Sequence, residues 1–223
     1  MTRLSVLVCI SAFFQGFLSM GFQLVATRLL APFFGSTLLV WSFVISTFLA
    51  AFSVGALLGG LSSQLPARRL MASLIALVLV GLAGYGVTAT QGHAILQLMD
   101  SSLDNAFLAL GLSCFFLFFF PVTCLSALLP IFTEALVAGG SRGGMSTGIV
   151  YGVSTLGNIT GVMATAFVLI PSFATSTILL GWTASAAVCF ALFVWLIGCA
   201  APRFTPARRI GETAGSPPPS LRA

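Results

Sequence analysis

Apolar stretches separated by short polar breaks fill the chain from Leu4 to Cys199. A membrane-spanning helix needs about 20 consecutive apolar residues, and each stretch has about that length or more. Inside the stretches, Arg28 is almost the only ionisable side chain. The pattern therefore predicts six membrane-spanning helices, over Leu4–Thr27, Thr37–Leu61, Leu70–Val87, Ala106–Leu136, Gly148–Ile170 and Thr175–Cys199.

Prolines and glycines mark where these helices end or bend. We expect the first helix to end at Arg28, before a turn that contains Pro32 and Gly35. Pro121 and Pro130 fall within the fourth helix and predict a kink there, because proline lacks the backbone N–H that a helix uses. The third helix is expected to lead into a longer polar connection that holds Gln91, His93, Asp100 and Asp104.

The composition agrees with this pattern and excludes a water-soluble domain. Of the 223 residues, 58% are hydrophobic and 6% are charged, and the mean hydropathy is +1.12. A soluble fold could not hide so much apolar surface. We predict an all-α integral membrane protein with a transmembrane domain over residues 1–200. A disordered cytoplasmic tail is expected over residues 201–223, where proline, glycine and arginine replace apolar residues.

Arginines orient the predicted bundle, because basic residues in short loops stay on the cytoplasmic side of a membrane. With both termini in the cytoplasm, the arginines other than Arg28 fall on one side: Arg3, Arg68, Arg69, Arg142, Arg203, Arg208, Arg209 and Arg222. The net charge of +5 is therefore a sign of topology, and no nucleic acid partner is expected because no basic patch is interleaved with aromatic residues. We expect the chain in a bacterial inner membrane.

Residue types suited to catalysis or cofactor binding are scarce. His93 is the only histidine and the five cysteines form no C-x-x-C pair, so the sequence predicts no metal site and no cofactor. The acidic side chains Asp100, Asp104 and Glu134 lie at or beyond the ends of the predicted helices. Without paired acids or a nucleophile beside a base, we expect no catalytic residues and no enzymatic activity.

Small residues recur every four positions in the second and fifth predicted helices. Such spacing lets two helix backbones approach closely in lipid, where van der Waals contact drives association. We expect packing faces at Ala51, Gly55 and Gly59 in the second helix, and at Gly148, Gly152, Gly157 and Gly161 in the fifth. Each face could pack within the bundle or against a partner.

A set of polar residues is the candidate contact site for a solute or partner. Gln23 and Thr27 accompany Arg28 on the first helix, and the fifth helix contributes Tyr151, Ser154 and Asn158. A buried arginine is costly unless it is partnered, so these groups are candidate companions. As a functional site, Arg28 would hold an anion or carboxylate. As a structural residue, it would reach lipid headgroups or loop carbonyls at the membrane interface.

Two blocks of sequence carry a family resemblance. The first runs from Gln23 to Ser36 and continues with Trp41 and the stretch Gly55–Gly60, and the second runs from Gly148 to Pro171. Together they resemble the membrane domain of fused major-facilitator/spermidine-synthase-like proteins, in the transmembrane part only and without the synthase domain. This chain has Gln23 where that family tends to have a glutamate. The resemblance implies a bundle like half of a major-facilitator transporter, built from a three-plus-three inverted repeat.

Two hypotheses about function follow. Alternating access needs two such halves, so a six-helix unit would pair with another membrane protein or with itself as a homo-oligomer. We favour an accessory or structural subunit that packs against a larger membrane complex, because the interior lacks carboxylates and small-residue faces are abundant. The alternative is a homodimeric transporter, or transporter half, for a small organic solute. Under either hypothesis membrane lipid surrounds the protein.

Overall fold

The computed structural model describes residues 3–138, 140 and 142–200, and this part of the chain contains helices and no strand. The predicted tail over residues 201–223 lies outside the described residues. The α-helices are α1 (Arg3–Phe34), α2 (Leu38–Ser63), α3 (Ala67–Ser102), α4 (Ala106–Cys114), α5 (Phe120–Ser126), α6 (Leu128–Ala138), α7 (Gly143–Ala164), α8 (Ile170–Ser172) and α9 (Thr175–Ala200). Two π-helical segments connect some of them, η1 (Phe115–Phe119) and η2 (Thr165–Leu169).

Six stretches of the described chain are long and apolar enough to cross a membrane: Ser5–Phe34, Leu38–Ser63, Arg68–Ser102, Ala106–Val137, Gly143–Ser172 and Thr175–Leu192. The fourth of these spans combines α4, η1, α5 and α6, and the fifth combines α7, η2 and α8. The predicted all-α fold with six membrane spans is confirmed, and the chain has the character of an integral membrane protein.

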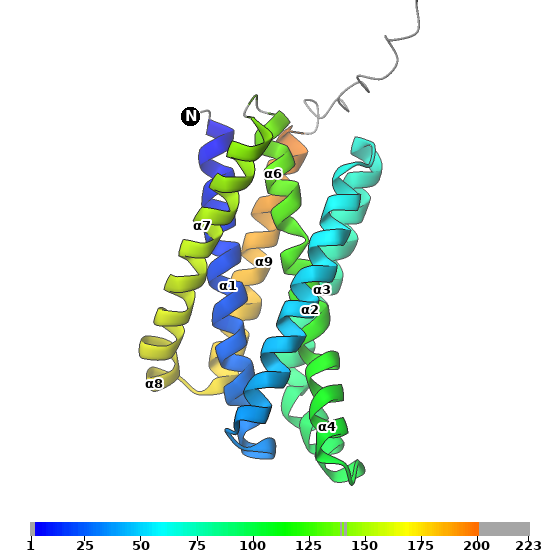
Figure 1. Cartoon of the computed structure of the whole chain (residues 1–223), viewed down its shortest axis with the longest axis vertical. Helices are drawn as coiled ribbons and strands as arrows, with labels where there is room; N and C mark the ends of the chain where they lie inside the picture. The colour runs from blue at the N-terminus through cyan, green and yellow to red at the C-terminus, as the bar shows by residue number, and fades with distance from the viewer. Residues whose placement is uncertain (1–2, 139, 141, 201–223) are drawn as a thin grey trace, which may run out of the picture.

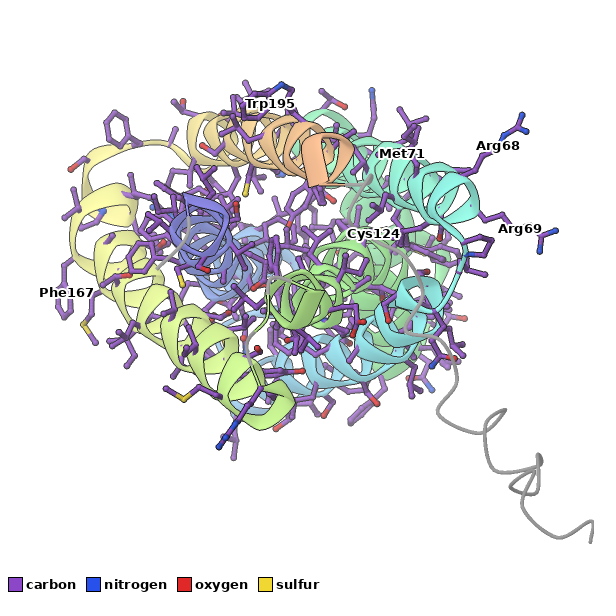
Figure 2. All side chains as sticks on the ribbon, turned by 90° about the horizontal axis from the view of Figure 1, so that it is seen from above. Arg68, Arg69, Met71, Cys124, Phe167 and Trp195 are labelled. Carbon is purple, nitrogen blue, oxygen red and sulfur yellow. The ribbon has the colours of Figure 1, made fainter. Side chains whose placement is uncertain are left out.

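The spans lie side by side in three layers, which are clearest along the long axis of the bundle (Figure 2). One outer layer holds α3 and α9, and the other holds α2 and α7. Between them lie α1 and the fourth span. The spans of all three layers run along the long axis of the bundle (Figure 1). The middle layer is the most enclosed. Half of the most apolar 18-residue segment of α1 is buried, and 61% of that segment in the fourth span, against 22–28% in the other four spans.

The pairing of the spans is symmetric between the two halves of the chain. The first span packs on the fifth, the second on the fourth, and the third on the sixth, with further contacts of the third on the fourth and of the first on the sixth. Exchanging the first three spans with the last three leaves this pattern unchanged. Because each half has an odd number of spans, the two halves run in opposite directions through the membrane. This is the arrangement that a three-plus-three inverted repeat produces.

Four aromatic rings fill the centre of the bundle. The ring centroid of Phe22 on α1 lies 4.7 Å from that of Tyr85 on α3, 5.7 Å from that of Phe118 in η1 and 6.0 Å from that of Phe48 on α2. Each of the four side chains is at most 1% exposed. Aromatic pairs at these separations attract one another beyond the area they bury, so the rings tie four spans together at one point.

The prediction that the first helix ends at Arg28 is wrong. The helix α1 continues through Pro32 to Phe34 and ends where Gly35 adopts a φ of 74°, which glycine tolerates best. Proline this close to the end is tolerated because only one hydrogen bond is lost, and the N–H of Gly35 still bonds to the carbonyl of Ala31 at 3.0 Å.

The predicted polar connection after the third helix is also wrong, because α3 continues to Ser102. The chain from Thr88 onward is amphipathic: Thr88, Gly92 and Leu96 are buried at four-residue spacing, whereas Gln91 and His93 are exposed. The polar residues that suggested a loop are therefore the outward face of a helix. The connection to α4 is left with residues 103–105 alone.

The expected kink in the fourth span is confirmed, and its form is specific. The π-helical segment η1 ends two residues before Pro121, and η2 in the fifth span ends two residues before Pro171. A wider π turn accommodates a proline that cannot donate to the preceding turn. A second interruption lies at Ala127, between α5 and α6, where Pro130 leaves the carbonyl of Ser126 without its usual helical donor. The fifth span begins at Gly143, five residues before the expected start.

Candidate functional site

Arg28 lies near the end of α1 and is half-buried. Its guanidinium Nη1 donates hydrogen bonds to the carbonyl oxygens of Ile170 and, at 3.5 Å, of Phe173. These carbonyls belong to the end of the fifth span, where helix carbonyls lack intrahelical partners and the helix dipole is negative. Arg28 therefore fastens the end of α8 to α1, a contact between residues 142 positions apart in sequence.

In the described part of the chain, Arg28 donates no hydrogen bond to the polar residues that were expected to accompany it. Thr27 donates from Oγ1 to the carbonyl of Leu24 on its own helix at 2.8 Å. Gln23 is half-buried, one turn before Thr27. The geometry of Arg28 agrees with the structural interpretation, in which it binds loop and helix-end carbonyls.

Ser154 belongs to a different place, a buried polar network deep in the bundle. Its hydroxyl donates to Oε1 of Gln15 at 3.0 Å, and Nε2 of Gln15 donates to the carbonyl of Leu125 at 3.3 Å. The same amide nitrogen lies 3.5 Å from Oγ of Ser19. Gln15 is 2% exposed and connects α1, α7 and α5. Its acceptor, the carbonyl of Leu125, lies beside the interruption at Ala127, where the regular α-helix between α5 and α6 is broken.

The six candidate polar residues therefore do not form one cluster. Along the fifth span, Ser154 precedes Ile170 by 16 residues, about 24 Å of helix, so the Ser154 network and the Arg28 contact are well separated. Asn158 is half-buried one turn after Ser154, and Tyr151 is 44% exposed on the outside of α7. Gln15, which the sequence analysis did not single out, is the residue that joins three spans.

The glycine faces are confirmed on the second helix and on one half of the fifth. A Cβ added at Gly157 would lie 2.9 Å from the carbonyl carbon of Phe13, and one at Gly161 would lie 2.8 Å from Cα of Phe17. On α2, a Cβ at Gly55 would meet Ser126 and one at Gly59 would lie 2.8 Å from the carbonyl carbon of Ala127, while Ala51 is fully buried. Both faces therefore pack within the bundle.

Gly148 and Gly152 do not pack within the bundle, which was one of the two alternatives for their face. Both are exposed, and an added Cβ at either position would meet nothing within 4 Å. Gly144 lies four residues earlier and is equally open. The first half of α7 thus turns a strip of small residues, Gly144, Gly148 and Gly152, toward the outside. We call this the α7 glycine strip.

The described residues contain no group of three or more histidine, cysteine, aspartate or glutamate side chains that could hold a metal ion. Cys114 and Cys124 are buried free thiols in the fourth span, and Cys9 and Cys189 are half-buried. Asp100 and Glu134 are exposed near opposite ends of the bundle, on α3 and α6. Among the residues that the structure describes, no acid, base and nucleophile lie together at one point.

Several pockets open along the surface of the bundle. Two adjoining ones lie between α1 and α9, with volumes of about 390 Å³ and 330 Å³, and both are lined mainly by apolar side chains. A third, of about 360 Å³, lies among α1, α3 and α9 near His93. The ring of His93 contacts that of Phe33, with centroids 4.8 Å apart.

Comparison with known proteins finds no matching family model, no matching curated protein and no matching solved structure. The resemblance to the major-facilitator/spermidine-synthase-like family therefore stays a prediction, drawn from the two sequence blocks.

Proposed function

We propose that this protein is an accessory or structural subunit that packs against a larger membrane complex. The observation that carries the proposal is the α7 glycine strip, whose three glycines face outward with open space where side chains would be. Glycine in a helix interior costs about 0.5–1 kcal/mol relative to alanine, so Gly148 and Gly152, which lie inside α7 on a face without neighbours, call for another reason. Close approach of a partner helix in lipid supplies one.

The interior of the bundle supports a structural role. Rings of Phe22, Phe48, Tyr85 and Phe118 occupy its centre and are at most 1% exposed. The buried polar side chains are neutral: Gln15 and Ser154 bond to each other, whereas the buried hydroxyl of Tyr85 has no hydrogen-bond partner in the described part of the chain. A carrier of a polar or charged solute would need polar groups around a central path. A filled, neutral centre suits a protein whose contacts are made on its outer surface.

The alternative function is a homodimeric transporter, or transporter half, for a small organic solute. The symmetric pairing of the two halves of the chain favours it, because transporters are commonly built from such inverted repeats. In that case the partner at the α7 glycine strip is a second copy of this chain, and Arg28 is the candidate solute contact. Uptake into reconstituted vesicles that is lost on Arg28→Ala would support this alternative.

The remaining parts of the proposal concern location and chemistry. We place the protein in a bacterial inner membrane with both termini in the cytoplasm, on the strength of the arginine distribution in the sequence. We propose no enzymatic activity, no cofactor and no nucleic acid partner.

The experiment that tests the proposal is site-specific crosslinking in native membranes. A photoreactive residue at position 148 should crosslink to one membrane protein in a stoichiometric product, which intact-mass measurement then identifies as another chain or a second copy. The matched control is position 86 on α3, because an added Cβ at Gly86 likewise meets nothing within 4 Å. That position should give no product.

Bulky substitutions provide the second arm of the experiment. Gly148→Leu should release the chain from its complex in mild detergent, whereas Gly86→Leu should leave the complex intact. A product with a different chain supports the accessory role, and a product with a second copy supports the alternative. Isolation of the unsubstituted protein as a clean monomer, without a crosslink at position 148, would overturn both.

A further inference from the structure

A groove runs between α1, η2 and α9 on the outside of the bundle. It has a volume of about 330 Å³, and its walls include Phe17, Leu169, Phe173, Gly181 and Trp182. We call it the Phe173 groove. It lies on the surface that the membrane spans turn toward lipid, and only small hydroxyls interrupt its apolar lining.

The walls of the Phe173 groove are held in place by the bundle itself. The ring of Trp182 stacks on that of Phe17, with centroids 5.9 Å apart and planes inclined by 20°. The indole N–H donates to the carbonyl of Leu18 at 2.9 Å, and the side chain is 5% exposed. Gly181 borders open space in the groove, because an added Cβ there would meet nothing within 4 Å. The groove therefore exists before anything binds in it.

A positive charge lies at one end of this groove. Arg28 donates to the carbonyl of Phe173, a residue that lines the groove. The hydrogen bonds of Arg28 in the described part of the chain go to carbonyl oxygens and not to a carboxylate, so the negative end of the helix dipole offsets only part of its charge. The helix α9 begins two residues after Phe173, without an acidic residue in its first turn, so its positive end adds to the same potential.

The depth of Arg28 matches that of a lipid headgroup. The helix α1 has 32 residues, which span about 48 Å at 1.5 Å per residue, against a hydrocarbon thickness of about 30 Å. Arg28 lies six residues before the end of α1, about 9 Å from it, which is where the hydrocarbon gives way to headgroups. From Phe173 the groove extends along α9 to Ser185, about 15 Å from the first residue of that helix, which is the depth of about one leaflet.

The shape of the groove decides between a lipid chain and a protein helix. A volume of about 330 Å³ is well below the volume on the order of 1,000 Å³ that a helix occupies over about 15 Å of its length. A helix with its side chains is about 10–12 Å across and does not fit. A single acyl chain is narrow enough. We propose that the Phe173 groove binds one acyl chain of an anionic phospholipid whose phosphate pairs with Arg28. This inference does not depend on the proposed accessory function.

Fluorescence quenching of Trp182 tests the proposal directly, because its indole is part of the groove wall. Trp41→Phe and Trp195→Phe leave Trp182 as the one tryptophan of the chain, since the sequence has three. The protein is reconstituted into phosphatidylcholine vesicles that contain either chain-brominated phosphatidylglycerol or chain-brominated phosphatidylcholine. A single arginine near a membrane surface favours an anionic lipid about fivefold. Half-maximal quenching should therefore need about fivefold less brominated phosphatidylglycerol than brominated phosphatidylcholine.

Three substitutions separate the charge from the groove. Arg28→Gln should remove the preference between the two lipids, and Arg28→Lys should keep it. Gly181→Phe should weaken quenching by both lipids, because the new ring fills the groove. The matched control is Gly86→Phe on α3, at an equally open position outside the groove, which should change neither the preference nor the quenching.

Several outcomes would overturn the proposal. Equal quenching by the two brominated lipids, or a preference that survives Arg28→Gln, would remove the headgroup contact. Unchanged quenching in Gly181→Phe would place the acyl chain elsewhere. Loss of the preference when inorganic phosphate is added to the buffer would show that Arg28 takes a free anion. Shielding of Trp182 from both lipids in the native assembly would mean that a protein segment covers the groove.

Discussion

Substitution of Gly157 by alanine should weaken the packing of α1 on α7. The added Cβ would overlap the carbonyl oxygen of Phe13 and lie 2.9 Å from its carbonyl carbon, whereas ordinary contacts begin near 3.4 Å, so the two backbones must separate there by more than about 0.5 Å. A gap of 0.5–1 Å forfeits about a quarter to a half of the dispersion attraction between facing atoms. Overpacking of this kind costs about 1–3 kcal/mol.

The matched control is Gly152→Ala, five residues earlier on the same helix. Its new Cβ meets nothing within 4 Å, so only the gain in helix propensity remains, about 0.5–1 kcal/mol in favour of the variant. Since both variants share that gain, the difference between them measures the packing of α1 on α7 alone. Steric trapping in bicelles gives the free energy of unfolding for each. Equal values for Gly157→Ala and Gly152→Ala would refute the reasoning.

Two further predictions concern the buried network and the topology. The first is a double-mutant cycle of Gln15→Met and Ser154→Ala. The coupling energy for unfolding should be about 0.6 kcal/mol and at most about 1.7 kcal/mol, as for other hydrogen bonds between membrane helices. A coupling energy of zero would mean that the two side chains do not bond in the membrane. The second uses Asp104→Cys and Arg142→Cys in a background without other cysteines. The two new thiols should react with an impermeant maleimide from opposite sides of the membrane, because one complete span, Ala106–Val137, separates them. Labelling of both from the same side would contradict the six-span arrangement.

The number and type of the spans could be predicted because lipid imposes one simple rule on sequence. Each span needs about 20 apolar residues in a helix, and that requirement produces long apolar stretches that are visible in the sequence. The same rule does not tell whether polar residues outside the hydrocarbon form a helix or a loop. Gln91 and His93 therefore suggested a loop, although they are the exposed face of the last three turns of α3.

The direction of a helix face could not be predicted from spacing alone. Gly148 and Gly152 have the same four-residue spacing as Gly157 and Gly161, yet only the second pair meets the backbone of α1. Each four-residue step rotates by about 400°, about 40° more than one full turn, so a long strip drifts around the helix axis. The strip that starts on the outside of α7 is thus not continuous with the face that packs inside.

Long-range partners were also beyond reach of the sequence. Arg28 bonds to carbonyls 142 and 145 positions away, and the pattern offered only its neighbours on the same helix. Gln15 escaped notice because a single amide in an apolar stretch has no periodic signature. Gln15 binds the carbonyl of Leu125 beside the interruption at Ala127. Pro130, which leaves the neighbouring carbonyl of Ser126 without its helical donor, was the one sign in the sequence that the helix would be irregular there.

The pairing of α1 with α7 also has a consequence for biogenesis. Gly16 and Ser154, whose backbones touch, are made on the order of 10 s apart at typical rates of translation. During that interval the first helix sits in the bilayer without its main neighbour, and its bare glycine surface is open to the wrong helix. The insertion machinery, or the ribosome-bound nascent chain itself, must keep that surface unoccupied until the fifth helix arrives.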